Sequence, residues 1–218
     1  MYIPKSFQLR DPDIIETLLR EHSFATLVTQ QGGDICASHV PLVYRPDEGA
    51  LYGHLAKANP QAEHLRDGRC LAIFQGPHAY VSPSWYGMEE QVPTWNYLAV
   101  HVYGRAHLVQ ESEAVADLLH LLLVAYEPQS RLPADRDRAY YRNLMRGIVA
   151  FRIDIERMEA AAKLSQNKPM EARRRVAATL ASMDDEGARG VARWMQQLSV
   201  NDANLSFSPS KEERSHGT

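Results

Sequence analysis

Hydrophobic and polar residues alternate with a period of two along several stretches of the chain, and this spacing predicts β-strands. The longest stretch is Tyr97–Val109, where Leu98, Val100 and Val102 share one face and polar or aromatic residues occupy the other. Gly147–Glu156 alternates in the same way and predicts a last strand. Shorter strands, separated by turn residues, are predicted at Ser23–Thr29, Ile35–Tyr44, Ala50–Leu55, Cys70–Gln75 and His78–Ser82.

Apolar residues at helical spacing predict helices between and after these strands. Asp11 and Pro12 suit the cap and first turn of a helix whose apolar face begins at Ile14. A helix that begins near Ser112 is predicted to end before Pro128. Further helices are predicted from Asn59 to about Arg66, over Arg136–Met145, from Pro169 onward and around Val191–Leu198, with Ser182-x-x-Asp185 as a capping box.

The sum is six or seven mostly antiparallel strands with helices inserted between them and added at the C-terminus. This mixture predicts an α+β protein that is mainly β, built as a small closed barrel with peripheral helices. We expect a barrel domain at 1–165, a helical extension at 166–199 and a flexible tail at 200–218. Pro41 lies inside a predicted strand but has no amide hydrogen to donate to a neighbouring strand. This indicates a sheet edge, a bulge or a bound ligand there.

The composition is that of a soluble globular protein, with 218 residues of which 23 % are charged and 44 % are apolar. The chain has 24 Lys and Arg residues and 27 Asp and Glu residues, so its net charge is −3. Binding to DNA requires a concentrated basic surface, and direct DNA contact is therefore only weakly supported. Arg173–Arg175 is the one basic cluster in the sequence and a weak signal for DNA binding. Three successive residues spread around most of the circumference of a helix, so a solvated helix face is the alternative interpretation.

Cysteine and histidine usage favours neither a disulfide framework nor a metal site. Cys36 and Cys70 do not form a Cys-x-x-Cys pair, and we expect both to be small buried hydrophobes. His101 and His107 lie on one strand face but about 20 Å apart, too far to share a metal ion. No apolar run reaches the roughly 20 residues of a membrane span, and Met1–Lys5 lacks the apolar region of a signal peptide, so we expect a cytoplasmic protein without membrane contact.

One segment combines cationic side chains with a helix start. His54 and Lys57 follow a predicted strand, and the helix at Asn59 begins directly after them. Cations beside free backbone N–H groups form an anion site. A solvated lysine and an Asn-Pro helix cap explain the same residues. The common nucleotide-binding loops and the hydrolase nucleophile motif are absent, so the catalytic residues are unknown.

Two other segments, Gln75–Tyr86 and Val92–Tyr97, have an unusual composition that combines Gly, Pro and large aromatic residues. Three roles are open for such aromatic residues: stacking on a planar ligand, lining a subunit interface or filling the core. Lys163–Asn167 is a run of hydrogen-bond donors at a strand-to-helix junction, where a simple helix cap is the alternative.

These segments together resemble the PaiB family, described as FMN-binding negative transcriptional regulators with a flavin-type split β-barrel. The resemblance runs in order from residue 2 to about residue 180. The segments that carry it are Tyr2–Lys5, His39–Leu42, Leu51–Pro60, Phe74–Tyr86, Val92–Tyr97 and Lys163–Asn167.

The resemblance implies a split-barrel homodimer, similar to the pyridoxamine phosphate oxidase-like flavoproteins, with an FMN-sized cleft at the subunit interface. The FMN phosphate would meet His54, Lys57 and Asn59. The flavin ring would lie against the strand formed by Ser38, His39, Val40 and Pro41. The cleft would be closed by Trp95, Asn96, Lys163, Ser165 and Gln166, including from the partner subunit.

Three functions are compatible with such a protein. The first is a flavin-binding repressor of transcription, which acts on DNA directly or through a partner. The second is a flavin- or haem-dependent oxidoreductase that uses the same cleft, because in such enzymes the cofactor supplies the chemistry. The third is a flavin-binding protein without catalysis.

Overall fold

The computed structural model describes residues 1–66, 68–129, 143 and 145–205. The chain divides into two compact units. The first consists of Met1–Gly76 and Leu98–Ala162, and the second of Pro77–Tyr97 and Lys163–Thr218. The segment 77–97, which we had grouped with the barrel domain, thus falls in the second unit. None of the helices in the described ranges is long and apolar enough to cross a membrane.

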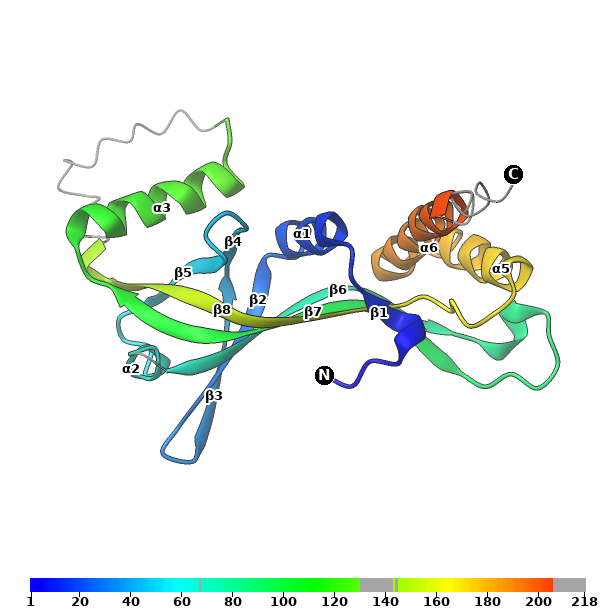
Figure 1. Cartoon of the computed structure of the whole chain (residues 1–218), viewed down its shortest axis with the longest axis horizontal. Coiled ribbons are helices and arrows are strands. Elements are labelled where there is room, and N and C mark those ends of the chain that lie inside the picture. Colours follow the sequence, from blue (N-terminus) through cyan, green and yellow to red (C-terminus); the bar gives the residue numbers. More distant parts are fainter. Residues whose placement is uncertain (67, 130–142, 144, 206–218) are drawn as a thin grey trace, which may run out of the picture. The chain divides into compact units, whose positions relative to one another are not determined.

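An eight-stranded sheet forms the centre of the fold (Figure 1). Its main path has the order β3-β2-β6-β7-β8-β5-β4, and β1 pairs with β8. The strands are β1 (Gln8–Leu9), β2 (Phe24–Gln31), β3 (Asp34–Pro41), β4 (Val43–Arg45), β5 (Ala50–Ala56), β6 (Arg69–Val81), β7 (Thr94–Val109) and β8 (Ile148–Lys163). Every pairing with a described register is antiparallel, as the alternation and the short turns predict.

The first and last strands of this path, β3 and β4, lie close together because a single residue connects them in the chain. β3 ends at Pro41 and β4 begins at Val43, so only Leu42 separates the two terminal strands of the path. A Cβ atom at Gly53 in β5 would lie 3.1 Å from the Pro41 carbonyl oxygen, so the chain after β3 passes directly over β5. This approach closes the sheet into a barrel. Pro41 is the last residue of a terminal strand, which confirms the prediction of an edge.

Several strands differ from the sequence prediction. Ile35–Tyr44 was expected to be one strand but is divided between β3 and β4, and β1 was not predicted. Cys70–Gln75 and His78–Ser82 were expected to be separate, but both belong to the single strand β6. The Gly76-Pro77 pair between the two predicted strands lies in mid-strand, where a Cβ at Gly76 would lie 3.1 Å from the Cβ of Leu98. β8 continues to Lys163, seven residues beyond the predicted end at Glu156. The run of Ala160, Ala161 and Ala162 is buried in this extension.

The helices that cover the first unit were predicted from the sequence, except for the short helix at Lys5–Phe7. They are η1 (Lys5–Phe7), α1 (Pro12–Glu21), α2 (Gln61–His64) and α3 (Ser112–Tyr126). The Asp11 carboxylate accepts hydrogen bonds from the amides of Asp13 and Ile14, at 3.0 and 3.4 Å, which confirms the predicted cap. The helix predicted at 136–145 lies largely outside the described residues.

The interior of the first unit is apolar and continuous through the barrel. Burial of these side chains is the main favourable contribution to folding. Its largest fully buried side chains are Leu18, Leu19, Leu27, Leu42, Leu51, Leu65, Phe74, Leu98, Phe151 and Ile153.

The second unit contains η2 (Pro83–Tyr86), α5 (Met170–Ala181) and α6 (Glu186–Leu205). α5 packs against both α6 and η2. The predicted capping box is wrong. The Ser182 hydroxyl donates to the Thr179 carbonyl and closes the end of α5, whereas the Asp185 carboxylate accepts from the Ala188 amide at 2.6 Å and caps α6. The two residues therefore cap two different helices.

Candidate functional site

A polar network in the first unit joins β2, β3 and the start of α2. The Asn59 side-chain amide donates to the Ser38 hydroxyl at 2.9 Å, and its carbonyl oxygen accepts from the Gln61 backbone amide at 2.9 Å. Asn59 thereby fixes the turn that leads from β5 into α2. The structure thus brings together Ser38 and Asn59, two predicted site residues that lie 21 positions apart in the chain.

Gln61 is the buried centre of this network, with 1 % of its surface exposed. Its side-chain amide group lies 2.9 Å from the Leu27 carbonyl, 3.0 Å from the Thr29 hydroxyl and 3.2 Å from the Cys36 carbonyl. The sequence analysis missed Gln61. Its position beside the apolar Ala62, directly after Asn59-Pro60, was the only signal for it.

His54 and Lys57 lie at and just beyond the end of β5, as expected. The Nδ1 atom of His54 is buried and has no hydrogen-bond partner within the described ranges. Burial lowers the pKa of His54, so its imidazole is neutral at pH 7. The exposed Lys57 ammonium also has no ionic partner in the described part of the chain. The positive charge at this site therefore comes from Lys57.

The four residues of β3 that were expected to face a flavin point to two sides. Val40 is buried and Ser38 is half-buried, whereas His39 between them is exposed. The His39 ring stacks on Phe24, with centroids 6.0 Å apart, and its Nδ1 lies 3.2 Å from the Thr26 hydroxyl. A ligand on one face of β3 therefore contacts either the side chain of His39 or that of Ser38, and not both.

The second unit gathers another part of the predicted set around a buried hydroxyl. The Ser165 hydroxyl lies 2.8 Å from the Tyr86 hydroxyl and 3.2 Å from the side-chain oxygen of Asn96. The Asn96 amide in turn lies 3.6 Å from the sulfur of Met195. Ser165 adopts a left-handed backbone with φ of 63°, so this contact is maintained at a conformational cost. Tyr86, which completes the group, was not assigned to the site from the sequence.

Lys163 and Gln166 flank Ser165 and are also engaged. The Lys163 ammonium donates to the Thr94 hydroxyl, and burial lowers the pKa of Lys163. The Gln166 side chain accepts a hydrogen bond from the Leu164 amide at 2.7 Å. Both side chains thus support the turn after β8.

Trp95 lies in an aromatic cluster on the surface of the second unit, which we term the aromatic surface. It consists of His78, Tyr80, Trp85 and Trp95, with neighbouring ring centroids 6.2–6.3 Å apart. Trp95 is 53 % exposed and Tyr80 is 44 % exposed. The twelve predicted residues therefore form two sets. The first unit holds Ser38, His39, Val40, Pro41, His54, Lys57 and Asn59, and the second holds Trp95, Asn96, Lys163, Ser165 and Gln166.

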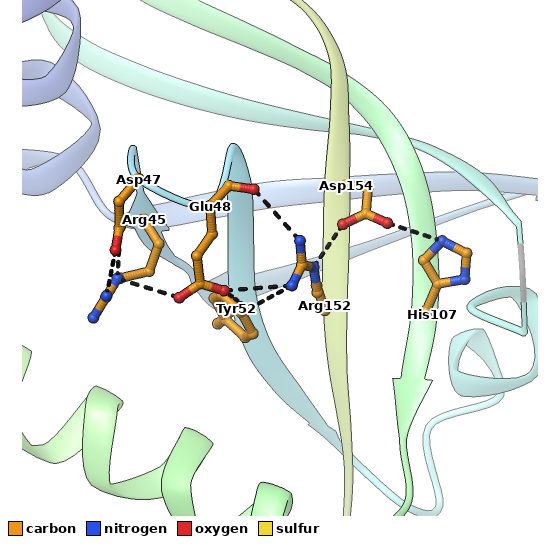
Figure 2. Close-up of polar contacts among 7 residues, drawn as sticks. All are labelled: Arg45, Asp47, Glu48, Tyr52, His107, Arg152 and Asp154. Carbon is orange, nitrogen blue, oxygen red and sulfur yellow. Dashed lines mark hydrogen bonds and ion pairs between the residues drawn. The ribbon is translucent and has the colours of Figure 1, made fainter.

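A separate charged network crosses β5, β7 and β8 on the first unit (Figure 2). Arg152 contacts Glu48 at 3.3 Å, the Tyr52 hydroxyl at 3.1 Å and Asp154 at 2.6 Å. His107 lies 3.3 Å from Asp154 at the far end of the network. These partly exposed pairs satisfy one another and contribute at most about 1 kcal/mol each, so we assign them a structural role.

Neither metal coordination nor cysteine chemistry is indicated. Among the residues that the structure describes, no group of three His, Cys, Asp or Glu side chains could hold a metal ion. Cys70 is buried as expected, and burial raises the pKa of its thiol to about 12. Cys36 is half-buried.

The residues at the end of β5 suit the phosphate of a flavin. The unpartnered Nδ1 of His54 supplies a hydrogen-bonding atom, and Lys57 supplies a positive charge that no carboxylate neutralises within the described residues. Both groups are typical of phosphate recognition.

The fold is that of the flavin-type split barrels. The described structure superposes on the FAD and heme binding protein of Mycobacterium smegmatis with a TM-score of 0.58 and 16 % identity, covering 78 % of this chain and 79 % of that chain. It superposes on the flavocytochrome Anf3 of Azotobacter vinelandii with a TM-score of 0.60 and 14 % identity, covering 86 % and 78 %. At these identities, the likeness concerns the fold.

The sequence comparison identifies the family. Residues 1–157 match the family described as "Putative FMN-binding domain", and the chain belongs to this family. It is 39 % identical to the protease synthase and sporulation protein PAI 2 of Bacillus subtilis (strain 168), over 90 % of this chain and 97 % of that protein. The predicted resemblance to the PaiB family and to a flavin-type split barrel is confirmed.

Proposed function

We propose that this protein binds FMN at the end of β5 and acts as a flavin-dependent negative regulator of transcription. The observation that carries the flavin site is a Lys57 ammonium without an ionic partner among the described residues, three positions after His54 at the end of β5. The family match over residues 1–157 supports FMN as the ligand. When bound, FMN supplies redox chemistry, and the chain's own residues supply its position.

Each residue has a distinct part in this proposal. Lys57 pairs with the phosphate, and His54 lies next to it at the end of β5. Asn59 acts as a positioning residue, because it fixes the turn after Lys57 through Ser38 and the Gln61 amide.

Flavin binding is tested by the absorbance spectrum of the purified protein and by titration with FMN and riboflavin. We expect FMN to bind more tightly than riboflavin, because only FMN carries the phosphate. Lys57→Ala should weaken FMN binding by about tenfold, which corresponds to one lost charge-assisted hydrogen bond. Riboflavin binding should not change. Arg174→Ala removes an exposed charge on α5 and is the control. Equal FMN affinity in wild type and Lys57→Ala would contradict the site.

The regulatory part of the proposal is supported by the relative in Bacillus subtilis, whose name refers to protease synthase and sporulation. The Arg173–Arg175 cluster gives little support for direct DNA contact. Arg173 is 6 % exposed, and the Arg175 guanidinium donates to the Tyr86 carbonyl at 3.0 Å. We therefore propose that regulation acts through a partner or through another surface, and not through this cluster.

Regulation is tested by deleting the gene in its host and measuring transcripts genome-wide. We expect a defined set of transcripts to rise on deletion and to fall again when the wild-type gene is restored. Lys57→Ala should fail to restore repression, whereas Arg174→Ala should restore it. An unchanged transcript profile on deletion would contradict the regulatory role, and restored repression by Lys57→Ala would separate it from flavin binding.

We also propose that the protein is a homodimer. The aromatic surface supports this proposal, because soluble monomers rarely expose clustered large aromatic side chains. A second copy of this chain is the occupant that the proposal assigns to it.

A further inference from the structure

One buried hydroxyl, that of Thr29 in β2, contacts both ends of α2. The side-chain amide of Gln61, the first residue of α2, donates to this hydroxyl at 3.0 Å. The Nδ1 atom of His64, the last residue of α2, lies 3.0 Å from the same hydroxyl. Thr29 is 2 % exposed. Because a helix of four residues is too short to be stable by itself, these contacts determine where α2 lies.

The turn before α2 carries Lys57, to which the proposed function assigns the flavin phosphate. This turn is connected to the barrel on three sides. The Lys57 backbone amide donates to the Gly147 carbonyl at 2.8 Å, beside the start of β8. The Asn59 side chain bonds to β3 at 2.9 Å. Gln61, two residues after Asn59, connects the end of the turn to β2.

The connection to β2 is buried, whereas Lys57 is exposed. Thr29 and Gln61 carry no charge and are almost fully buried, so neither side chain is available to contact a ligand at Lys57. Their effect on such a ligand passes through the backbone of the turn. A turn that is already fixed avoids the entropic cost of ordering it when a ligand binds.

We propose that Thr29 and Gln61 are positioning residues for the flavin phosphate. They hold the turn that carries Lys57 and thereby increase the preference of the site for FMN over riboflavin. Riboflavin lacks the phosphate, so the position of the Lys57 ammonium does not affect its binding. This inference rests on the proposed flavin site.

The test compares Thr29→Val, which keeps the shape of the side chain but removes the hydroxyl, with Thr29→Ser, which keeps the hydroxyl. The full-length variants are titrated with FMN and with riboflavin, and binding is followed by flavin fluorescence. We expect Thr29→Val to weaken FMN binding about fivefold, the effect of about one hydrogen bond, and to leave riboflavin binding unchanged. Thr29→Ser should bind FMN as the wild type does. Thr179→Val removes a hydroxyl that bonds within α5 of the second unit, and is the matched control.

A double-mutant cycle with Lys57→Ala separates positioning from a general loss of stability. If Thr29 acts through Lys57, adding Thr29→Val to Lys57→Ala should weaken FMN binding by less than about twofold further. Gln61→Met keeps the length of the side chain and loses the amide. This second variant should reproduce the loss that is selective for FMN. Melting temperatures show that each variant is folded at the temperature of the titration.

The outcomes are distinguishable. Equal FMN affinity in wild type and Thr29→Val would overturn this inference while the flavin site stands. Equal weakening of FMN and riboflavin, or full additivity with Lys57→Ala, would also overturn it, because either result would show that Thr29 contributes only to general stability. An FMN affinity that Lys57→Ala leaves unchanged would overturn the proposed flavin site, and this inference with it.

Discussion

At the residue scale, Gln61 shows how one buried amide connects segments far apart in the chain. Its amide group bonds to backbone carbonyls of both β2 and β3. An apolar side chain at this position would remove these hydrogen bonds, of which the one to the Leu27 carbonyl is buried. Each unsatisfied buried group costs about 1–3 kcal/mol, so its surroundings require an amide.

We expect Gln61→Leu to lower the free energy of unfolding by about 2–4 kcal/mol, because the buried hydrogen bonds of its amide group with the Leu27 carbonyl and the Thr29 hydroxyl are lost. Urea denaturation measures the change. Gln30→Leu, at an exposed position of β2, should change stability by less than about 0.5 kcal/mol and is the control. Similar losses in the two variants would show that the network does not stabilise the fold.

Three half-buried histidines make stability sensitive to acid. Burial lowers the pKa of His22, His54 and His101 from 6.5 in the folded state. Below about pH 6.5 the unfolded chain therefore binds more protons than the folded one. The free energy of unfolding falls as the pH falls through this range, by at most about 1.4 kcal/mol per pH unit for each histidine.

We expect unfolding curves at pH 7.5 and pH 5.5 to show a lower stability at pH 5.5. His54→Leu should reduce the difference between the two pH values, because one group that resists protonation is gone. Gln30→Leu, at an exposed position without an ionisable group, should leave the difference as in wild type. An identical pH dependence in wild type and His54→Leu would contradict this assignment.

At the element scale, the junction between α5 and α6 depends on Asp185. Its carboxylate satisfies a free amide at the start of α6, whereas Ser182 closes α5 from an exposed position. We expect Asp185→Ala to cost about 1 kcal/mol of stability, as for other lost N-caps. Ser182→Ala should cost less in the same denaturation assay. A larger loss of stability for Ser182→Ala than for Asp185→Ala would instead favour the capping box that the sequence suggested.

The contact between β7 and β8 depends on Gly104. A Cβ at this position would lie 2.3 Å from the Asp154 carbonyl oxygen and 2.7 Å from a methyl carbon of Ile153. Gly104→Ala therefore forces the two strands apart, and we expect a loss of about 1–3 kcal/mol, measured by thermal unfolding. An unchanged melting temperature would show that the strands can shift without cost.

At the scale of the whole molecule, the aromatic surface is the feature that sets the expected assembly. Light scattering after size-exclusion chromatography should give about twice the 24.6 kDa of one chain. Trp95→Glu places a charge on the surface and should shift the protein toward the monomer. Met183→Glu, on another exposed hydrophobic residue, should remain dimeric. A wild-type monomer at tens of micromolar would contradict the dimer.

The sequence by itself determined most strand and helix positions and the family. The alternation in Tyr97–Val109 and the Asp11 cap are local signals, because side-chain period and capping act within a few residues. The edge at Pro41 followed from a missing amide hydrogen. Local signals were wrong at Gly76-Pro77, which separated two predicted strands and lies within the single strand β6.

Only the tertiary structure decided which polar groups meet. Ser38 and Asn59 come together because β3 and the turn after β5 converge, and Gln61 reaches β2 and β3 for the same reason. A cavity in the first unit likewise combines Lys57 with Arg146, 89 positions later, because β5 pairs with the start of β8. Strand order sets these long-range contacts, and a single sequence without its pairing partners does not specify that order.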